Sequence, residues 1–271
     1  MDVVLDVVND VVVDPYLLPN PSHPWLQRDA WQRMLITLSI VVISGGYVLY
    51  FLFATISYFF LWDREIAKHN RYLNNQARKE IKLAASSIPV MAGLTVPLFL
   101  LEVLGYSRLY NSVDEYGWPF LVCSLFTFLL FTDFGIYWIH RWLHHPLLYA
   151  RLHKPHHRWI VTTPFASHAF HPLDGFLQSV PYHIYVFCFP MHKLAYLGMF
   201  VFVNFWTISI HDCNYRVPRF LVNIVNGAAH HTYHHLYFNY NYGQFFTLWD
   251  RLGGSHRMPK FYQEKYAGKA A

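Results

Sequence analysis

The sequence predicts an all-α integral membrane protein, in which three long transmembrane helices and a short apolar hairpin carry a cytoplasmic, histidine-rich helical cap. Of its 271 residues, 54% are hydrophobic and 14% are charged, whereas soluble domains average about 25% charged residues. Several apolar runs approach or exceed the roughly 20 residues that a helix needs to cross a bilayer. The 18 histidines also outnumber the 16 Asp and Glu residues combined.

Three long apolar runs are predicted to cross the membrane as helices, namely residues 34–62, 83–104 and 119–139. Two shorter runs follow, residues 176–190 and 194–210, and their lengths make them marginal spans. We expect these two runs to form a hairpin that either crosses the membrane twice or only dips into it. In both cases the segments that flank the hairpin lie on the same side of the membrane.

Basic residues predict the orientation, because cytoplasmic loops are enriched in Lys and Arg. Loop 63–82 carries six basic and three acidic residues, whereas segment 1–33 carries five Asp and two Arg. We therefore expect a lumenal segment 1–33, a transmembrane scaffold 34–139 and a cytoplasmic catalytic region 140–271 that includes the hairpin 176–210.

Several other chemistries lack support in the sequence. The three cysteines have no short spacing, which excludes a disulfide framework and a thiolate metal site. The chain contains no His-Glu-x-x-His, no Gly-x-Ser-x-Gly, no P-loop and no Gly-x-Gly-x-x-Gly motif. We expect no bound nucleotide or flavin and no nucleic-acid partner, so any electrons must come from a partner protein.

Fifteen of the histidines lie between residues 140 and 235, and most of these form three clusters. Residues three and four apart share one face of a helix, so each cluster is expected to aim its imidazoles at one point. The predicted metal ligands are His140, His144, His145, His153, His156, His157, His230, His231, His234 and His235, together with His211 at the end of an apolar run. Pro155 is expected to open a helix within the second cluster.

So many imidazoles exceed the four to six ligands that one ion takes, and they suit two ions. Nitrogen ligands favour zinc, copper, iron or nickel over magnesium and calcium. Metal-bound imidazoles also need acceptors for their outer N–H groups. Further ligands or such outer partners are expected among His168, His171, Asp133, Asp174, Asp212 and Asp250.

The three histidine clusters resemble those of the membrane di-iron fatty acid hydroxylase/sterol desaturase superfamily. The flanking residues 151–185 and 211–255 are similar to its sterol C-5 desaturase branch. Tyr233, inside the third cluster, departs from the polar or acidic residue expected there. The resemblance implies one catalytic domain over roughly 120–257, with two iron ions bound by the histidines.

The resemblance also implies a reaction. Lathosterol, a Δ7 sterol, would lose two hydrogens from C-5 and C-6 to give 7-dehydrocholesterol in cholesterol biosynthesis. Dioxygen would be the co-substrate, and cytochrome b5 with NADH-cytochrome b5 reductase would supply electrons at the endoplasmic reticulum membrane. Zinc can replace iron through mismetallation.

Two alternative functions stay open. A fatty acid or C-4 methyl sterol hydroxylase of the same superfamily would produce a new hydroxyl group instead of a double bond. A histidine-rich metal transporter would hold exchangeable zinc, with ligands near the bilayer midplane.

Overall fold

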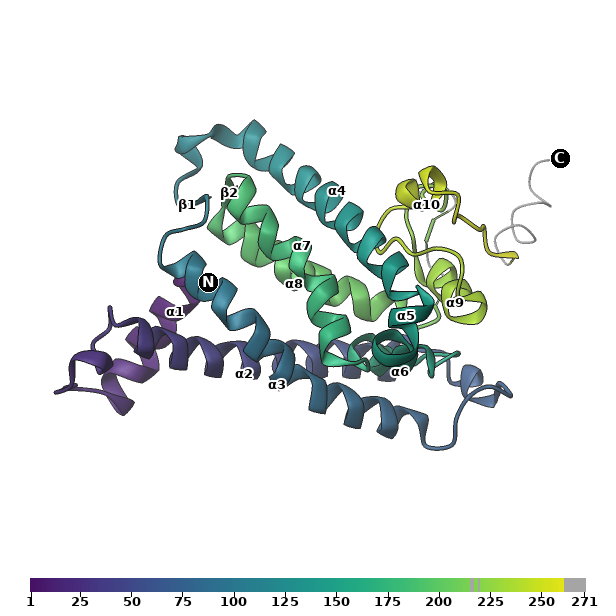
Figure 1. Ribbon diagram of the computed structural model, residues 1–271, viewed down its shortest axis with the longest axis horizontal. Coiled ribbons are helices and arrows are strands. Elements are labelled where there is room, and N and C mark those ends of the chain that lie inside the picture. Colours follow the sequence, from purple (N-terminus) through teal and green to yellow (C-terminus); the bar gives the residue numbers. More distant parts are fainter. Residues whose placement is uncertain (215–216, 219, 261–271) are drawn as a thin grey trace.

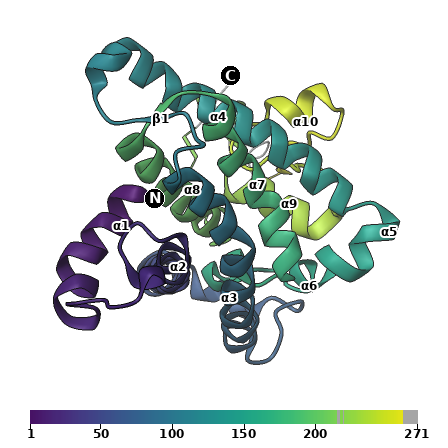
Figure 2. The same cartoon turned by 60° about the vertical axis from the view of Figure 1, so that its left-hand side comes forward.

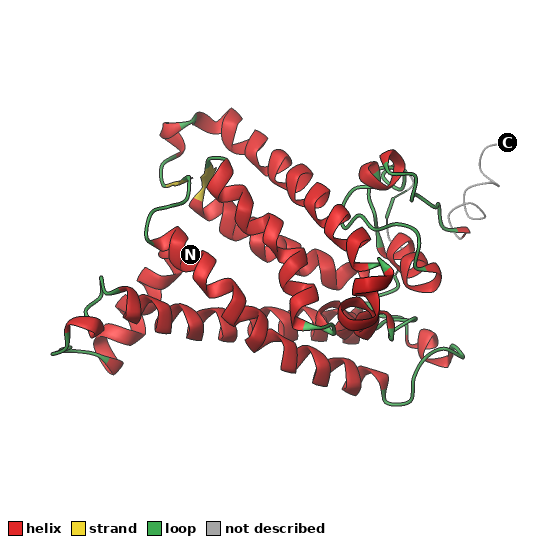
Figure 3. Ribbon diagram, viewed as in Figure 1, coloured by secondary structure: helices red, strands yellow, loops and turns green. Residues whose placement is uncertain are grey.

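The computed structural model describes residues 1–214, 217–218 and 220–260. Its described residues are mostly helical, with one pair of two-residue strands (Figure 3). The main elements are α1 (Asp2–Val8), α2 (Trp31–Phe60), α3 (Gln76–Val103), β1 (Leu109–Tyr110), α4 (Gly117–Leu143), α5 (Pro146–Leu148), α6 (Lys154–His157), α7 (Pro172–Cys188), β2 (Met191–His192), α8 (Lys193–Ile210), α9 (Ala228–Tyr237) and α10 (Leu248–Leu252).

Four helical segments are long and apolar enough to cross a membrane: Pro24–Phe60, Gln76–Val103, Gly117–Leu143 and Lys193–Ile210. The first three include nearly all of the three predicted long spans, the first ending two residues earlier and the second one residue earlier than predicted, and the fourth is the second arm of the predicted hairpin. The second span continues through Pro89 and Pro97 as one helix. Membrane helices tolerate proline because neighbouring groups satisfy the freed backbone carbonyls.

The hairpin consists of α7 and α8, which run antiparallel. Its turn lies in β2, which pairs in parallel with β1, so that Leu109 faces Met191 and Tyr110 faces His192. Figure 1 shows these strands at one end of the molecule, with α5, α6 and α9 at the other end. The predicted hairpin is therefore confirmed as a pair of antiparallel helices, and its tip reaches the end opposite the histidine clusters.

Prolines set the helix ends that position the histidines. The residue before a proline is pushed out of the α region. His145 precedes Pro146 and has a ψ of 138°, so α4 ends at Leu143 with His140 in its last turn. Pro155 lies in the first turn of α6, as the sequence predicts.

The transmembrane helices hold the irregular segment 159–170 through side-chain donors. Tyr50 of α2 donates to the Phe165 carbonyl at 3.0 Å. Gln76 and Ser87 of α3 donate to the carbonyls of Val161 and Phe170 at 2.7 and 2.6 Å. Side chains thereby satisfy three carbonyls of this buried segment, whose own regular structure is a short 3₁₀ helix at Pro164–His168. They fix the chain that connects α6 to α7.

The bundle is built from helix pairs that surround a central space. Helix α2 packs against α3, α4 packs against α7, and α8 contacts both α2 and α4 (Figure 2). A Cβ on Gly46 of α2 would lie 3.2 Å from the Cγ2 atom of Ile88 on α3. The Gly45-Gly46 pair thus permits a close approach of these two helices.

The crossing of α4 and α7 depends on a glycine. A Cβ on Gly135 would lie 2.7 Å from the Cγ atom of Pro181. Because the proline ring is rigid, Gly135→Ala is expected to lower the free energy of unfolding by about 1–3 kcal/mol. Thermal unfolding of the detergent-solubilised protein measures this change.

Gly198→Ala in α8 is the matched control. A Cβ there meets nothing within 4 Å, and alanine is the better helix former by about 1 kcal/mol. Equal unfolding midpoints for the two variants would contradict a tight crossing at Gly135.

Candidate metal centre

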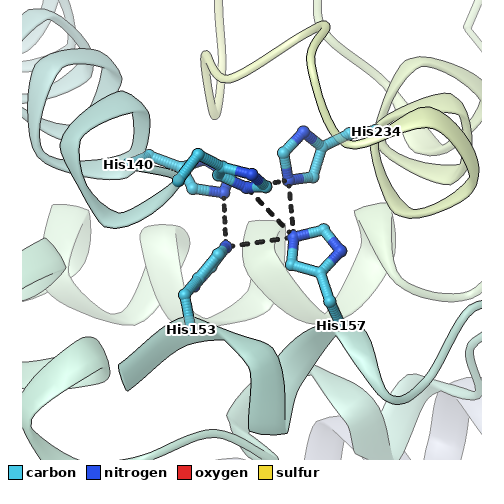
Figure 4. A group of neighbouring side chains, drawn as sticks. His140, His153, His157 and His234 are labelled. Atoms are coloured by element: carbon cyan, nitrogen blue, oxygen red, sulfur yellow. Dashed lines mark hydrogen bonds between the residues drawn. The ribbon is translucent and has the colours of Figure 1, made fainter. Parts of the chain in front are cut away.

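Nine histidine side chains converge into two neighbouring groups at one end of the bundle. Within each group, one nitrogen of every imidazole lies within 4.8 Å of the corresponding nitrogens of the others. The first group is His140, His144, His153, His157 and His234, and the second is His156, His211, His231 and His235. Figure 4 shows four members of the first group, with their inner nitrogens facing one another.

Adjacent histidines in the sequence contribute to different groups. Consecutive residues on a helix are rotated by about 100° from each other. His156 and His157 on α6 therefore point to different groups, and His234 and His235 on α9 do the same. Two short helices thus supply both groups, which brings the two groups side by side.

The hydrogen bonds made by the outer nitrogens of the imidazoles indicate that the inner nitrogens carry lone pairs. The Nδ1 atoms of His140 and His234 lie 2.8 Å from the carbonyl oxygens of Tyr242 and Tyr240. A carbonyl only accepts, so each Nδ1 carries the single proton of a neutral imidazole and each Nε2 is bare. Nδ1 of His153 likewise donates to the Asp174 carboxylate at 2.8 Å, so its Nε2 is bare as well, yet this atom lies 3.0 Å from the Nε2 of His140. Bare nitrogens so close together need a shared cation.

The spacing of the inner nitrogens fits a metal ion. Neighbouring Nε2 atoms in the two groups lie between 2.9 and 3.3 Å apart. For metal–nitrogen distances of about 2.0–2.1 Å, nitrogens on octahedral through tetrahedral ions lie about 2.8–3.4 Å apart. The donor set of neutral imidazoles also suits a transition metal.

Burial keeps these imidazoles in the neutral form that binds metals. Burial, reinforced by neighbouring imidazoles, holds the pKa of His156, His157 and His231 well below the ordinary value. The same causes lower the pKa of His234 and His235. Burial also lowers the pKa of His211 to about 4. These side chains therefore remain unprotonated at neutral pH.

Acceptors outside the two groups fix the orientation of the rings. Asp174, at the start of α7, accepts from Nδ1 of His153 at 2.8 Å and from Nε2 of Gln178 at 2.7 Å. Both His153 and Asp174 are fully buried. The carbonyl of Thr207 faces Nδ1 of His211 at 2.6 Å. Such outer partners hold a ligand ring in one tautomer and one orientation.

Two buried carboxylates shape the loop 240–246 that supplies the Tyr240 and Tyr242 carbonyls. Asp133, inside α4, accepts the backbone N–H groups of residues 244, 245 and 246 at 2.7–3.0 Å. Asp250 accepts the N–H groups of residues 242 and 243 at 2.8 and 2.7 Å. Burial raises the pKa of Asp250 to about 6. Both carboxylates position the loop and lie outside the two imidazole groups.

A cavity of about 310 Å³ extends from the histidine groups into the helical bundle. Its volume is within the range of about 300–1,000 Å³ typical of ligand pockets. Its wall is formed mostly by apolar residues of α2, α3, α7 and α8, and His140, His156, His211 and His231 line one end. A ligand in this cavity lies among the spanning helices and faces both histidine groups.

Known proteins are similar to this chain over most of its length. The family model described as fatty acid hydroxylase matches residues 125–255. The chain is 54% identical to lathosterol oxidase of Homo sapiens over 267 residues, which are 98% of this chain and 88% of the relative. It is 51% identical to a delta(7)-sterol 5(6)-desaturase of Schizosaccharomyces pombe, over 96% of this chain and 84% of the relative.

The chain belongs to the sterol C-5 desaturase family. A delta(7)-sterol 5(6)-desaturase of Saccharomyces cerevisiae is also 55% identical, over 86% of this chain and 64% of the relative. No solved structure matches the chain.

The structure of this sterol C-5 desaturase brings together nine of the eleven histidines expected as ligands, and leaves His145 and His230 outside both groups. His145 caps α5 by accepting the N–H of Leu147 at 3.4 Å. The His230 ring stacks on His256. His145 and His230 are each next to a histidine that joins one of the groups, but the local backbone turns their own side chains away from both groups.

The six further candidates also lie outside the two groups. Of these, Asp174 meets the expectation of an outer partner, because it accepts from His153. His171 caps α7 by accepting the N–H of Leu173 at 3.2 Å, and Asp212 accepts the N–H of Asn214 at 2.7 Å. His168 lines the cavity instead. Asp133 and Asp250 hold the loop described above.

Tyr233 points away from the two groups. Its hydroxyl accepts the N–H of Lys260 at 2.8 Å, and its ring packs on Tyr237.

Sequence reasoning missed the backbone carbonyls of Tyr240, Tyr242 and Thr207. A carbonyl leaves no mark in a sequence, because every residue has one. It also missed Asn204 in the cavity wall. In that case a signal was present, since an amide side chain is costly inside an apolar helix.

Removing the Asp174 carboxylate is expected to loosen the first group. Asp174→Ala leaves Nδ1 of His153 without its buried acceptor, and loss of such an outer partner typically lowers metal affinity about 10–100-fold. Metal content after titration with a chelator measures the change. Asp29→Ala, at an exposed N-terminal position, is the control, and equal metal retention in both variants would argue against this role.

Proposed function

We propose that this chain is a dioxygen-dependent sterol C-5 desaturase that converts lathosterol into 7-dehydrocholesterol in cholesterol biosynthesis. The observation that carries the proposal is the apolar cavity between spanning helices, which ends at both histidine groups. A sterol is an apolar molecule that resides in membranes, and such a cavity suits it. The names and high identity of the relatives support the same reaction.

Two iron ions are the proposed cofactors, one for each group of histidines. Iron supplies the redox and dioxygen chemistry that zinc lacks. The purified protein can carry zinc on the same nitrogens through mismetallation, so zinc alone would not argue against an iron enzyme. We propose residues 140–271 as the catalytic region, residues 34–139 as its scaffold and 1–33 as a lumenal segment.

The chain's own residues position the sterol and exclude water. The reaction removes one hydrogen from C-5 and one from C-6, and dioxygen with two electrons and two protons becomes two molecules of water. The walls of α3, α7 and α8 keep bulk water from the reacting carbons. No side chain in the described cavity wall is assigned as a base.

We propose that cytochrome b5 and its NADH-dependent reductase supply the electrons at the endoplasmic reticulum membrane. The chain has no nucleotide or flavin motif of its own. In the structure, loop 63–75 and the histidine groups lie at the same end of the bundle (Figure 1). The basic loop supports a cytoplasmic position for this end, where a soluble donor can dock.

The two alternatives differ in their products and in their geometry. A fatty acid or C-4 methyl sterol hydroxylase would release an alcohol, and product analysis by mass spectrometry distinguishes it. A metal transporter would place its ligands near the bilayer midplane. Here the groups lie at the end of the bundle, which favours the desaturase.

Ligand substitutions test the function directly. His156→Ala and His234→Ala each remove one imidazole from one group, and we expect both to abolish conversion of lathosterol and to lower the metal content. The measurement is sterol profiling of cells that lack this activity and then express each variant.

His145→Ala is the matched control, because His145 belongs to the first cluster in sequence but is exposed and outside both groups. It is expected to retain activity close to that of the unmodified protein. Full turnover by His156→Ala or His234→Ala would refute the metal assignment. Failure of the unmodified protein to consume lathosterol would refute the substrate alone.

The orientation can be tested with glycosylation acceptors, since the natural sequence has no Asn-x-Ser/Thr site in which x is not proline. A short linker carrying such a site in loop 105–116 should be glycosylated in the endoplasmic reticulum. The same linker in loop 63–75 should remain unmodified. The reverse result would invert the proposed topology.

A further inference from the structure

The wall of the cavity is mostly apolar but carries several polar side chains, and two of its polar regions, the near and the far station, contain histidines that lie outside the two groups. The near station consists of Ser167, His168 and Asn204, close to the histidine groups, and the far station contains His183. His168 Nε2 contacts Asn204 Oδ1 at 3.3 Å, and His168 Nδ1 contacts Ser167 Oγ at 3.1 Å. Polar groups facing an apolar cavity are costly unless they bind something.

The near station is adjacent to the second histidine group. Asn204, Thr207 and His211 follow one another at i, i+3 and i+7, which places them on one face of α8. The Thr207 carbonyl orients His211. On the other side of the cavity, the Phe170 ring lies 5.9 Å from the ring of His168 and 6.0 Å from that of His156. His168 is therefore a neighbour of the second group and not a member of it.

The near station retains unused hydrogen-bonding capacity. Asn204 donates one N–H to the Phe200 carbonyl at 2.8 Å and offers one oxygen lone pair to His168. A carboxamide has two N–H groups and two lone pairs, so a second donor and a second acceptor remain beyond these contacts. Burial lowers the pKa of His168 to about 4, which keeps this ring neutral. A hydroxyl group, which both donates and accepts a hydrogen bond, complements the unused N–H and the unused lone pair of Asn204.

The chemistry of a sterol selects the near station over the far one. The single hydroxyl of lathosterol is on C-3, and only C-4 separates C-3 from C-5. The hydroxyl is only a few bonds from C-5, so it must also lie near the histidine groups when C-5 and C-6 face them. His183 is nine residues along α7 from Asp174, or about 13–14 Å at the helical rise of 1.5 Å per residue. A hydroxyl bound there would hold C-5 far from both groups.

We propose that Asn204, whose amide is oriented by His168, binds the 3-hydroxyl of the sterol and so sets C-5 and C-6 against the two histidine groups. This inference rests on the proposed desaturase function. Both are positioning residues, because Asn204 holds the substrate, His168 orients Asn204, and neither contacts the reacting carbons. They also give the enzyme its preference for a free sterol over an apolar hydrocarbon or a sterol ester.

The test compares lathosterol with its 3-deoxy analogue in membranes that contain the full chain, cytochrome b5, its reductase, NADH and dioxygen. A site that binds a substrate hydroxyl rejects an analogue without it, because its buried polar groups are left unpaired. We expect the unmodified protein to prefer lathosterol by at least about tenfold in kcat/KM. Equal rates for the two substrates would overturn the proposal without any variant.

Variants then locate the preference. Asn204→Leu and His168→Phe keep side-chain size and are expected to raise KM for lathosterol, with little effect on the 3-deoxy analogue. The preference ratio should fall toward one. His183→Phe, which changes the far station, should keep the ratio. Metal content is measured for each variant. If the contact between α8 and residue 168 were merely structural, the substitutions would change yield or metal content and leave the preference for lathosterol over its 3-deoxy analogue intact.

The outcomes separate this inference from the function on which it rests. No conversion of lathosterol by the unmodified protein would mean that the proposed function fails. Conversion with a strong preference that persists in Asn204→Leu and His168→Phe would mean that only the hydroxyl assignment fails. Loss of the preference in His183→Phe alone would move the hydroxyl to the far station and likewise overturn the proposal.

Discussion

The candidate metal centre depends on the fixed acceptors that hold the outer N–H groups of its imidazoles and so turn their lone pairs inward. Four of the nine rings have such an acceptor, a carboxylate or a backbone carbonyl at 2.6–2.8 Å. Two of these carbonyls lie on loop 240–246, which is itself held by Asp133 and Asp250. Buried charges of the scaffold thus determine the orientation of the ligands.

The position of the centre in the bundle connects this constraint to the substrate. The histidines lie where α4 and α8 end, so they face the mouth of the cavity between the spanning helices. An apolar substrate can occupy that cavity while its reacting carbons face the two groups. The same arrangement leaves the outer surface of the centre at the end of the bundle, where a soluble electron donor can approach. Under the proposed function, this one fold serves a lipid substrate and a water-soluble electron donor.

The hydroxyl-binding inference adds a second fixed point to the active site. Two metal groups alone do not select among the many C–H bonds of a sterol. A polar pair on the cavity wall, joined to His211 through one face of α8, would fix the substrate relative to the ions. The regiochemistry would then follow from the spacing of Asn204 and His211 along one rigid helix.

The sequence by itself determined the spanning helices, because uncharged runs of about 20 residues have few other stable states. It also determined that the histidine clusters gather their imidazoles, because spacings of three and four residues put side chains on one face of a helix. Only the tertiary structure decided which histidine joins which group. His145 and His230 follow the same spacing rule as their neighbours, yet a proline-ended helix and the rotation of α9 direct them elsewhere. The roles of the loop 240–246 carbonyls and of Asn204 likewise required the fold, because they arise from contacts between segments far apart in the chain.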